Sequence, residues 1–163
     1  MKPETVTKRA AEVEAVNAAA AKVRAACAEL AEAYAATKAA TVGSPADAHA
    51  LLADMATFNQ ETLRVVLLNA RNRVIDTRTV YVGSIDSTLV RVGEVFREAI
   101  LQNAHAIIVA HNHPSGDPSP SPEDVALTRA MVEAGKLLDV AVLDHLIIAG
   151  TGFVSLKARG LGF

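Results

Sequence analysis

Cysteine is nearly absent from this 163-residue sequence, in which Cys27 is the single example. One thiol excludes an intrachain disulfide and a zinc cluster built on several cysteines. Long apolar runs are absent too: no stretch of about 18 apolar residues lacks a charged or strongly polar group, so no membrane span is expected. The first residues, MKPETVTKRAAEVEAV, lack the apolar segment of a secretory signal. We therefore expect a cytoplasmic protein with no membrane partner.

The sequence also lacks an excess of charge of either sign. It has 16 basic and 18 acidic residues, which gives a formal net charge of −2. There is no global basic field to attract nucleic acid, although a local basic patch can be hidden in such a sum. With 51% hydrophobic residues, the chain is long enough to form one domain with its own core.

Residues 4–41 contain no glycine or proline and are dominated by alanine, which predicts one long helix. Larger residues and one alanine follow steps of three and four: Val13, Val16, Ala20, Val23, Cys27, Leu30 and Tyr34. About three heptads of this kind favour a coiled coil, and with it a homo-oligomer. A helix packed on its own domain is an equal alternative, because alanine repeats produce apparent periodicity easily. We assign residues 1–43 to this alanine-rich heptad helix.

Residues 44–163 alternate between helical and strand patterns. Ser44, Pro45 and Asp47 resemble a capped helix start, and that helix should run to about Thr57. Amphipathic spacing predicts another helix with Val92, Val95, Phe96, Ala99 and Ile100 on one face. Strands are predicted at 63–69, 74–82, 106–110, 140–149 and 153–156, and a further helix at 122–138. The alternation predicts an α/β domain with a mixed β-sheet flanked by helices.

The most informative segment, HNHPSGDPSPSPED, begins where the strand 106–110 ends. In an extended chain, His111 and His113 project to the same side. The loop that follows, rich in proline, can return the first turn of the next helix, and with it Asp124, to the strand end. Two imidazoles and one carboxylate leave an open position, which is typical of a catalytic zinc site. Such a site supplies hydroxide near neutral pH.

Each of these residues also has a purely structural explanation. An HxH pair alone is weak evidence for a metal, and Asp124 can complete a capping box with Ser121 as N-cap. The two roles are compatible, because a hydroxyl can accept from the backbone and donate its proton elsewhere. Ser121 could therefore cap the helix and stabilise an oxyanion. The unpaired histidines are expected in the core or on the surface: His49, His105 and His145.

The spacing His111-x-His113-x7-Ser121-x2-Asp124 resembles the signature of the JAMM metalloproteases, also called JAB or MPN. The words HNHPSGDPSPSPED, VEAGKLL, LDHLIIAG and FVSLKARG resemble the RadC family over about residues 44–163. The resemblance implies a sheet architecture like that of cytidine deaminases. It also implies a zinc-dependent hydrolase that cleaves a peptide or isopeptide amide, with a ubiquitin-like conjugate as one option.

The same resemblance assigns a role to each site residue. His111, His113 and Asp124 would hold Zn²⁺, and Ser121 would assist the oxyanion. The family's upstream glutamate falls on Glu61. As a general base, it would take a proton from the attacking water and pass it to the leaving amine.

Two departures from the family pattern limit what can be transferred. Relatives often have histidine after the glutamate, where this sequence has Thr62. Full-length relatives carry an N-terminal helix-hairpin-helix module, and residues 1–43 do not resemble it, so we interpret the chain as a short form. The alternative function is a DNA-repair-associated accessory protein with little or no peptidase activity, which would bind DNA in a salt-sensitive way. A nucleotide deaminase is disfavoured because its P-C-x-x-C element is missing. A degenerate scaffold is disfavoured because the site residues are all present.

Overall fold

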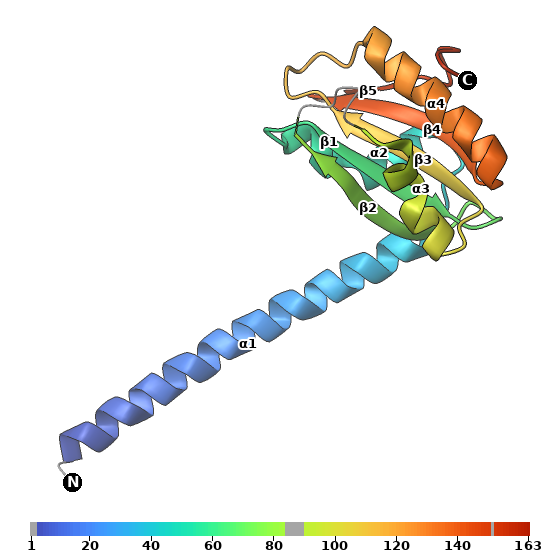
Figure 1. Cartoon of the computed structure of the whole chain (residues 1–163). Coiled ribbons are helices and arrows are strands. Elements are labelled where there is room, and N and C mark those ends of the chain that lie inside the picture. The colour runs from blue at the N-terminus through green and yellow to red at the C-terminus, as the bar shows by residue number, and fades with distance from the viewer. Residues whose placement is uncertain (1–2, 84–89, 151) are drawn as a thin grey trace. The chain divides into compact units, whose positions relative to one another are not determined.

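The protein is described by a computed structural model that covers residues 3–83, 90–150 and 152–163. The chain divides into two compact units, Met1–Thr37 and Lys38–Phe163. Helix α1 (Pro3–Ala39) forms the first, in agreement with the long helix predicted from the alanine-rich sequence (Figure 1). Among the described residues, no helix combines the length and the apolar character required to cross a membrane.

The predicted heptad positions of α1 carry exposed apolar side chains. Four of them are between 58% and 71% exposed: Val13, Val16, Val23 and Leu30. Tyr34, the last position of the predicted seam, lies outside the residues whose side chains are described. Burying an aliphatic side chain of this size is worth roughly 1.5–3 kcal/mol, so a row of them favours a covering partner. The homo-oligomer stays a prediction that solution experiments can test.

If a second copy covers the exposed seam of α1, as the heptad pattern predicts, deletion of residues 1–37 should lower the particle mass measured by light scattering. The cut spares Ala40, whose carbonyl accepts a hydrogen bond from the Val74 amide at 3.0 Å. The remaining unit keeps its own core, so its circular dichroism should show a folded α/β domain. A monomeric mass before and after deletion would refute the oligomer.

Two matched double variants test which face of α1 makes the contact between copies, whereas the deletion tests only whether α1 is needed. Val16→Glu with Val23→Glu puts charge on the seam and should lower the mass as the deletion does. Ala18→Glu with Ala25→Glu puts the same charge on the opposite face and should leave the mass unchanged. Equal behaviour of the two pairs would show that the heptad seam is not the contact.

The second unit is built on one five-stranded sheet with the strand order β2-β1-β3-β4-β5. The strands are β1 (Thr62–Leu68), β2 (Val74–Val82), β3 (Ala106–Asn112), β4 (Ala141–Ala149) and β5 (Gly152–Ser155). Among the strands that the structure describes, only β3 and β4 are parallel, and the other neighbouring strands are antiparallel. A parallel pair needs a crossover, and helix α4 (Pro122–Leu138) provides it. The predicted mixed α/β fold is confirmed (Figure 1).

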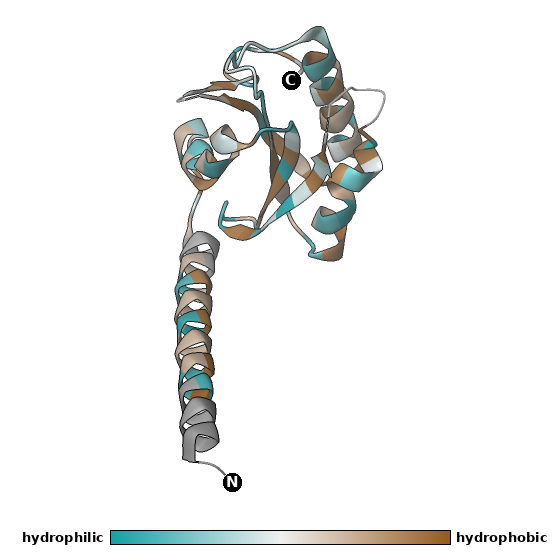
Figure 2. Cartoon of the chain, turned by 90° about the vertical axis from the view of Figure 1, so that its left-hand side faces the viewer, coloured by the Kyte–Doolittle hydropathy of each residue, from teal (hydrophilic) through white to brown (hydrophobic). Residues whose placement is uncertain are grey.

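Helices cover both faces of this sheet. Helices α3 (Val92–Leu101) and α4 pack on one face, while α2 (Pro45–Leu51) and the 3₁₀ helix η1 (Ala53–Thr57) pack on the other. Two apolar cores result, one on each face, and hydrophobic residues occupy the strands between the helical layers (Figure 2). Because the central strands β1 and β3 are buried on both faces, their sequences are mainly apolar rather than alternating.

Two details of the prediction are wrong. The helix that starts after Ser44 was expected to continue to Thr57, but it ends at Leu51, and η1 follows. Leu52 leaves the helical region (φ −118°, ψ 11°), and the tighter turn that follows lets both Leu52 and Met55 bury their side chains completely. Ile100 was expected on the buried face of α3 but is 56% exposed, because Val95, Phe96 and Ala99 fill that contact together with the partly buried Val92.

Candidate metal centre

The site lies where β3 ends, beside the start of β1. In the antiparallel pairing of these strands, Leu63 is opposite His111, so Glu61 enters the sheet next to the residues that follow His111. Strand β3 is also the first strand of the parallel crossover, and its carboxyl end leads into the loop before α4. Crevices at the carboxyl ends of parallel strands are the usual binding sites of α/β sheets.

Three side chains converge at this strand end. The His111 Nε2 and His113 Nε2 atoms are 3.0 Å apart, and Asp124 Oδ1 lies 3.1 Å from His111 Nε2. Asp124 Oδ2 lies 3.7 Å from His113 Nε2. One ligand atom from each residue lies within 4.8 Å of the others, a cluster that could bind a metal ion. The predicted convergence of these three residues is confirmed.

Asp124 reaches the site because the first turn of α4 is capped. Ser121 is the N-cap: its Oγ accepts from the Asp124 amide at 3.1 Å, and its own amide donates to Asp124 Oδ2 at 2.8 Å. The Ser121 hydroxyl also donates to Asp124 Oδ2 at 2.7 Å. The predicted capping box is therefore present, and the same carboxylate faces the histidines. The structural role and the ligand position are compatible.

The electrostatics of Asp124 keep it ionised. Burial by itself would raise the pKa of this carboxyl. Hydrogen bonds from His111 and Ser121, and the positive charge of the His111 ring when it is protonated, outweigh burial and hold the pKa well below its usual value. A carboxylate at this position is therefore available as an anionic metal ligand throughout the neutral range.

The outer nitrogen of each histidine is already occupied. His113 Nδ1 donates to the carbonyl of Asp117 at 2.8 Å, and His111 Nδ1 contacts His145 Nε2 at 2.9 Å. Burial, and then the neighbouring His111, hold the pKa of His145 well below its usual value, so that ring is neutral. Both Nε2 atoms are left facing Asp124. Two imidazole nitrogens and a carboxylate oxygen are the donor set of catalytic zinc sites, and the residues present fit that metal.

The three residues open into a pocket of about 250 Å³ that is also lined by Glu61, Ser115 and Ser121. Glu61 is half-buried there, and Ser121 is half-buried at the start of α4. The structure thus brings all five predicted site residues to one pocket. Their individual roles stay predictions.

The sequence pattern of the RadC-like JAB domain matches residues 42–161. The chain belongs to the RadC-like JAB domain family. UPF0758 proteins of Roseiflexus castenholzii and Chloroflexus aurantiacus are 55% and 57% identical to it over 123 residues, which is 75% of this chain. One from Clostridium beijerinckii is 46% identical over 121 residues.

This chain spans about half the length of the curated relatives it matches, 53% or 54% of each of these three. The resemblance to RadC proteins that the motifs indicated is confirmed by these matches. The names of these relatives give no activity.

One residue of the RadC-like JAB domain that sequence reasoning missed is Asn112, between the two histidines. Its Oδ1 accepts from the Thr62 amide at 2.8 Å, and its Nδ2 donates to the carbonyls of Phe58 and Gln60 at 3.3 and 3.2 Å. Asn112 is 1% exposed. It therefore fixes the backbone on both sides of Glu61. Alternation along a buried strand was the available signal: the residue between two ligands must face the opposite way.

The unpaired histidines have different environments. His49 stacks on the ring of Phe153 with the ring centroids 4.6 Å apart, and His105 is exposed. Both agree with the structural roles expected for them. His145 was expected either in the core or on the surface, and it is fully buried. It also contacts His111, which the spacing of the histidines in the sequence did not indicate.

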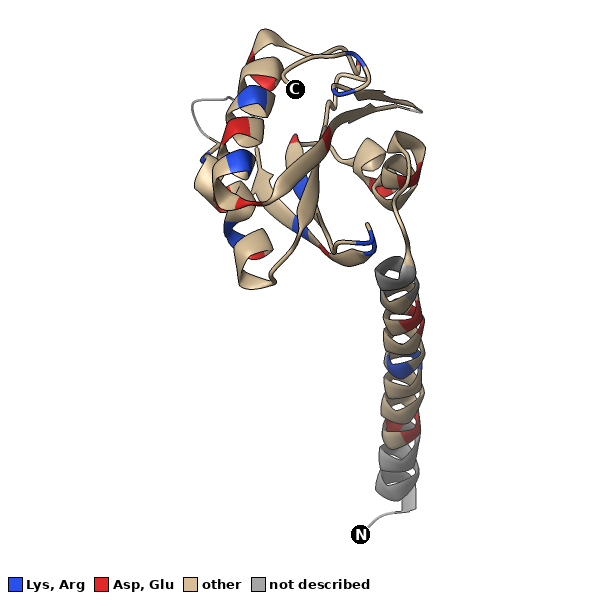
Figure 3. Cartoon of the chain, turned by 90° about the vertical axis from the view of Figure 1, so that its right-hand side faces the viewer, with Lys and Arg blue, Asp and Glu red and all other residues tan. Residues whose placement is uncertain are grey.

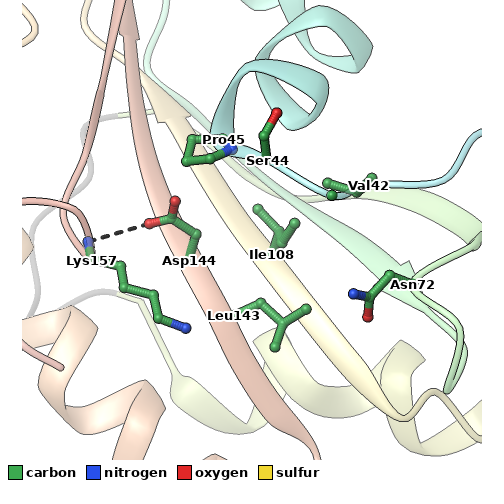
Figure 4. Close-up of a pocket in the computed structure, with 9 residues that line it drawn as sticks. Val42, Ser44, Pro45, Asn72, Ile108, Leu143, Asp144 and Lys157 are labelled. Carbon is green, nitrogen blue, oxygen red and sulfur yellow. Dashed lines mark hydrogen bonds between the residues drawn. The ribbon is translucent and has the colours of Figure 1, made fainter.

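A second hollow of about 310 Å³ lies on the opposite face of the sheet (Figure 4). It contains Ile108 of β3, which belongs to the core under α2, and the buried carboxylate of Asp144. Asp144 accepts hydrogen bonds from the Ser155 hydroxyl at 2.7 Å and from the amides of His145 and Lys157. These bonds hold the turn after β5 against β4.

Proposed function

We propose that this domain is a zinc-dependent hydrolase of the JAMM type that cleaves a peptide or isopeptide amide. The observation that supports it is the convergence of two imidazole Nε2 atoms and an ionised carboxylate in a pocket that also contains a second carboxylate, Glu61. Three protein ligands with one open position are typical of catalytic rather than structural zinc. Membership of the RadC-like JAB family supports the same chemistry.

Zn²⁺ held by His111, His113 and Asp124 would acidify a water and polarise the amide carbonyl. The remaining steps belong to the protein's own side chains. Glu61 takes the proton of the attacking water and delivers it to the amine nitrogen as the C–N bond breaks. The Ser121 hydroxyl donates to the carbonyl oxygen as negative charge develops there. That hydroxyl is bonded to Asp124 Oδ2, so it must turn, while the bond from the Asp124 amide keeps Oγ in place.

We expect the purified protein to contain about one zinc ion per chain, measured by elemental analysis. Binding to the folded state alone stabilises a protein by about 2.7 kcal/mol when free ligand is a hundredfold above Kd, so chelation should lower the melting temperature. Hydrogen exchange after chelation should increase mainly in residues 113–121, because the sheet has its own apolar cores. A metal-free protein that takes up no added zinc would refute the proposal.

The alternative, an accessory role on DNA, makes a different prediction. DNA affinity should then fall steeply with salt, with a slope set by the number of phosphate contacts. Charges of opposite sign alternate along α4, from Arg129 to Glu133 to Lys136, in the view of Figure 3. Such a surface does not favour a phosphate backbone. A peptide or protein substrate, including a ubiquitin-like conjugate, remains the partner we propose.

A further inference from the structure

Behind the metal centre, a hydrogen-bonded chain runs through Thr128 of α4. The Thr128 hydroxyl lies 2.6 Å from the main-chain carbonyl of Asp124 and 2.6 Å from His145 Nδ1. A carbonyl oxygen can only accept, so the single hydroxyl proton of Thr128 is directed to Asp124. The second contact must then be a donation from the ring, which places a proton on His145 Nδ1.

His145 passes this constraint on to His111. The ring is 0% exposed, and its two nitrogen atoms contact Thr128 and His111. With its one proton on Nδ1, the imidazole has an acceptor at Nε2. His111 Nδ1, 2.9 Å away, must therefore be the donor. The His111 Nε2 lone pair is then directed toward Asp124 and His113, where a metal ion would bind.

We propose that Thr128 and His145 form a relay that holds His111 in the Nδ1–H tautomer and thereby sets the affinity of the site for zinc. Both are positioning residues, because neither touches the centre. The relay begins at the main chain of one ligand, Asp124, and ends on the side chain of another, His111. It thus ties α4 to β3 through His145 of β4. The inference rests on the proposed metal centre for its functional consequence.

Loss of the relay has a definite chemical outcome. Without the Thr128 hydroxyl, His145 can place its proton on Nε2 and donate to His111 Nδ1. The His111 proton then sits on Nε2, where zinc must displace it. Loss of partners that orient a histidine ligand typically weakens metal binding ~10–100-fold.

Zinc affinity of the full chain, measured by competition with a chromogenic chelator, tests the relay. His145→Leu and Thr128→Val should each bind zinc ~10–100-fold more weakly than the original protein. Thr128→Ser keeps the hydroxyl and should stay within about threefold of it. Met131→Ala is the matched control: Met131 is fully buried on the same helix in the apolar core, so the melting temperature should fall while zinc affinity stays the same.

The tautomer itself can be observed by ¹⁵N NMR of the histidine rings in the metal-free protein, which separates this inference from the proposed function. We expect a proton on Nδ1 of His111 and of His145 in the original chain and in Thr128→Ser, and its loss from His111 Nδ1 in Thr128→Val. An unprotonated His111 Nδ1 in the original chain would overturn the relay, whether or not zinc binds. Unchanged zinc affinity in folded Thr128→Val would also overturn it. If His145→Leu does not fold, the two threonine variants still decide.

Discussion

Glu61→Gln is expected to retain zinc and the fold while turnover falls by ~10²–10⁴-fold, the usual contribution of a general base. Glutamine preserves the size of the side chain and can still hydrogen-bond the attacking water, but it cannot accept the proton. Glu61 lines the pocket without belonging to the cluster of three ligand atoms, so its replacement should not weaken metal binding. The measurement is the rate of hydrolysis of any peptide or isopeptide amide that the original protein cleaves.

The comparison with a ligand variant makes this result specific. His113→Ala should lose zinc itself, because one of three protein ligands is removed. Asp124→Ala should lose zinc too and also destabilise α4 by about 0.5–2 kcal/mol, since its capping box is broken. Zinc content and activity must be measured on the same preparations. If the Glu61→Gln protein contained no zinc, Glu61 would be a metal ligand. If it were fully active, another residue would be the general base.

The fold was predictable where burial leaves a clear trace in the sequence. The continuous apolar runs of β1 and β3 mark strands covered on both faces, and both were placed within two residues of their observed ends. Helix α4 was predictable because Ser121, Pro122 and Asp124 are the residues that a helix start requires. The end of α2 before Leu52 was not predictable, because the departure of Leu52 from the helix depends on the sheet against which it packs.

The three residues of the candidate metal site were accessible from the sequence because they are close together in the chain. His111 and His113 are two residues apart on an extended strand, and Asp124 follows after one loop. Glu61 was different, since without the family resemblance it was one acid among many. Only the antiparallel register of β1 and β3 brings it to the site. The contacts of Asn112 and His145 depend on the same long-range pairing and on the packing of α4.

Asn112→Ala is expected to lower turnover by about 10²-fold while zinc is retained. The Asn112 side chain makes three hydrogen bonds to the backbone of residues 58–62. None of these bonds involves His111, His113 or Asp124. Without the amide, residues 58–62 lose these three hydrogen bonds to β3, and a displacement of about 1 Å of a catalytic group can cost this much in rate. Zinc binding should persist, because His111 and His113 keep their own contacts to His145 and Asp117.

The substitution also lowers stability, and a control has to separate the two effects. Each buried polar group left without a partner costs about 1–3 kcal/mol. Ser155→Ala is a suitable control, because Ser155 is buried and its hydroxyl bonds Asp144 and the Ala158 amide, on the face of the sheet away from the pocket. Both variants should melt at lower temperature, but only Asn112→Ala should lose turnover well below its melting temperature. Equal turnover in the two variants would show that Asn112 has only a structural role. Loss of zinc in Asn112→Ala would show that Asn112 acts through the metal-binding residues rather than through Glu61.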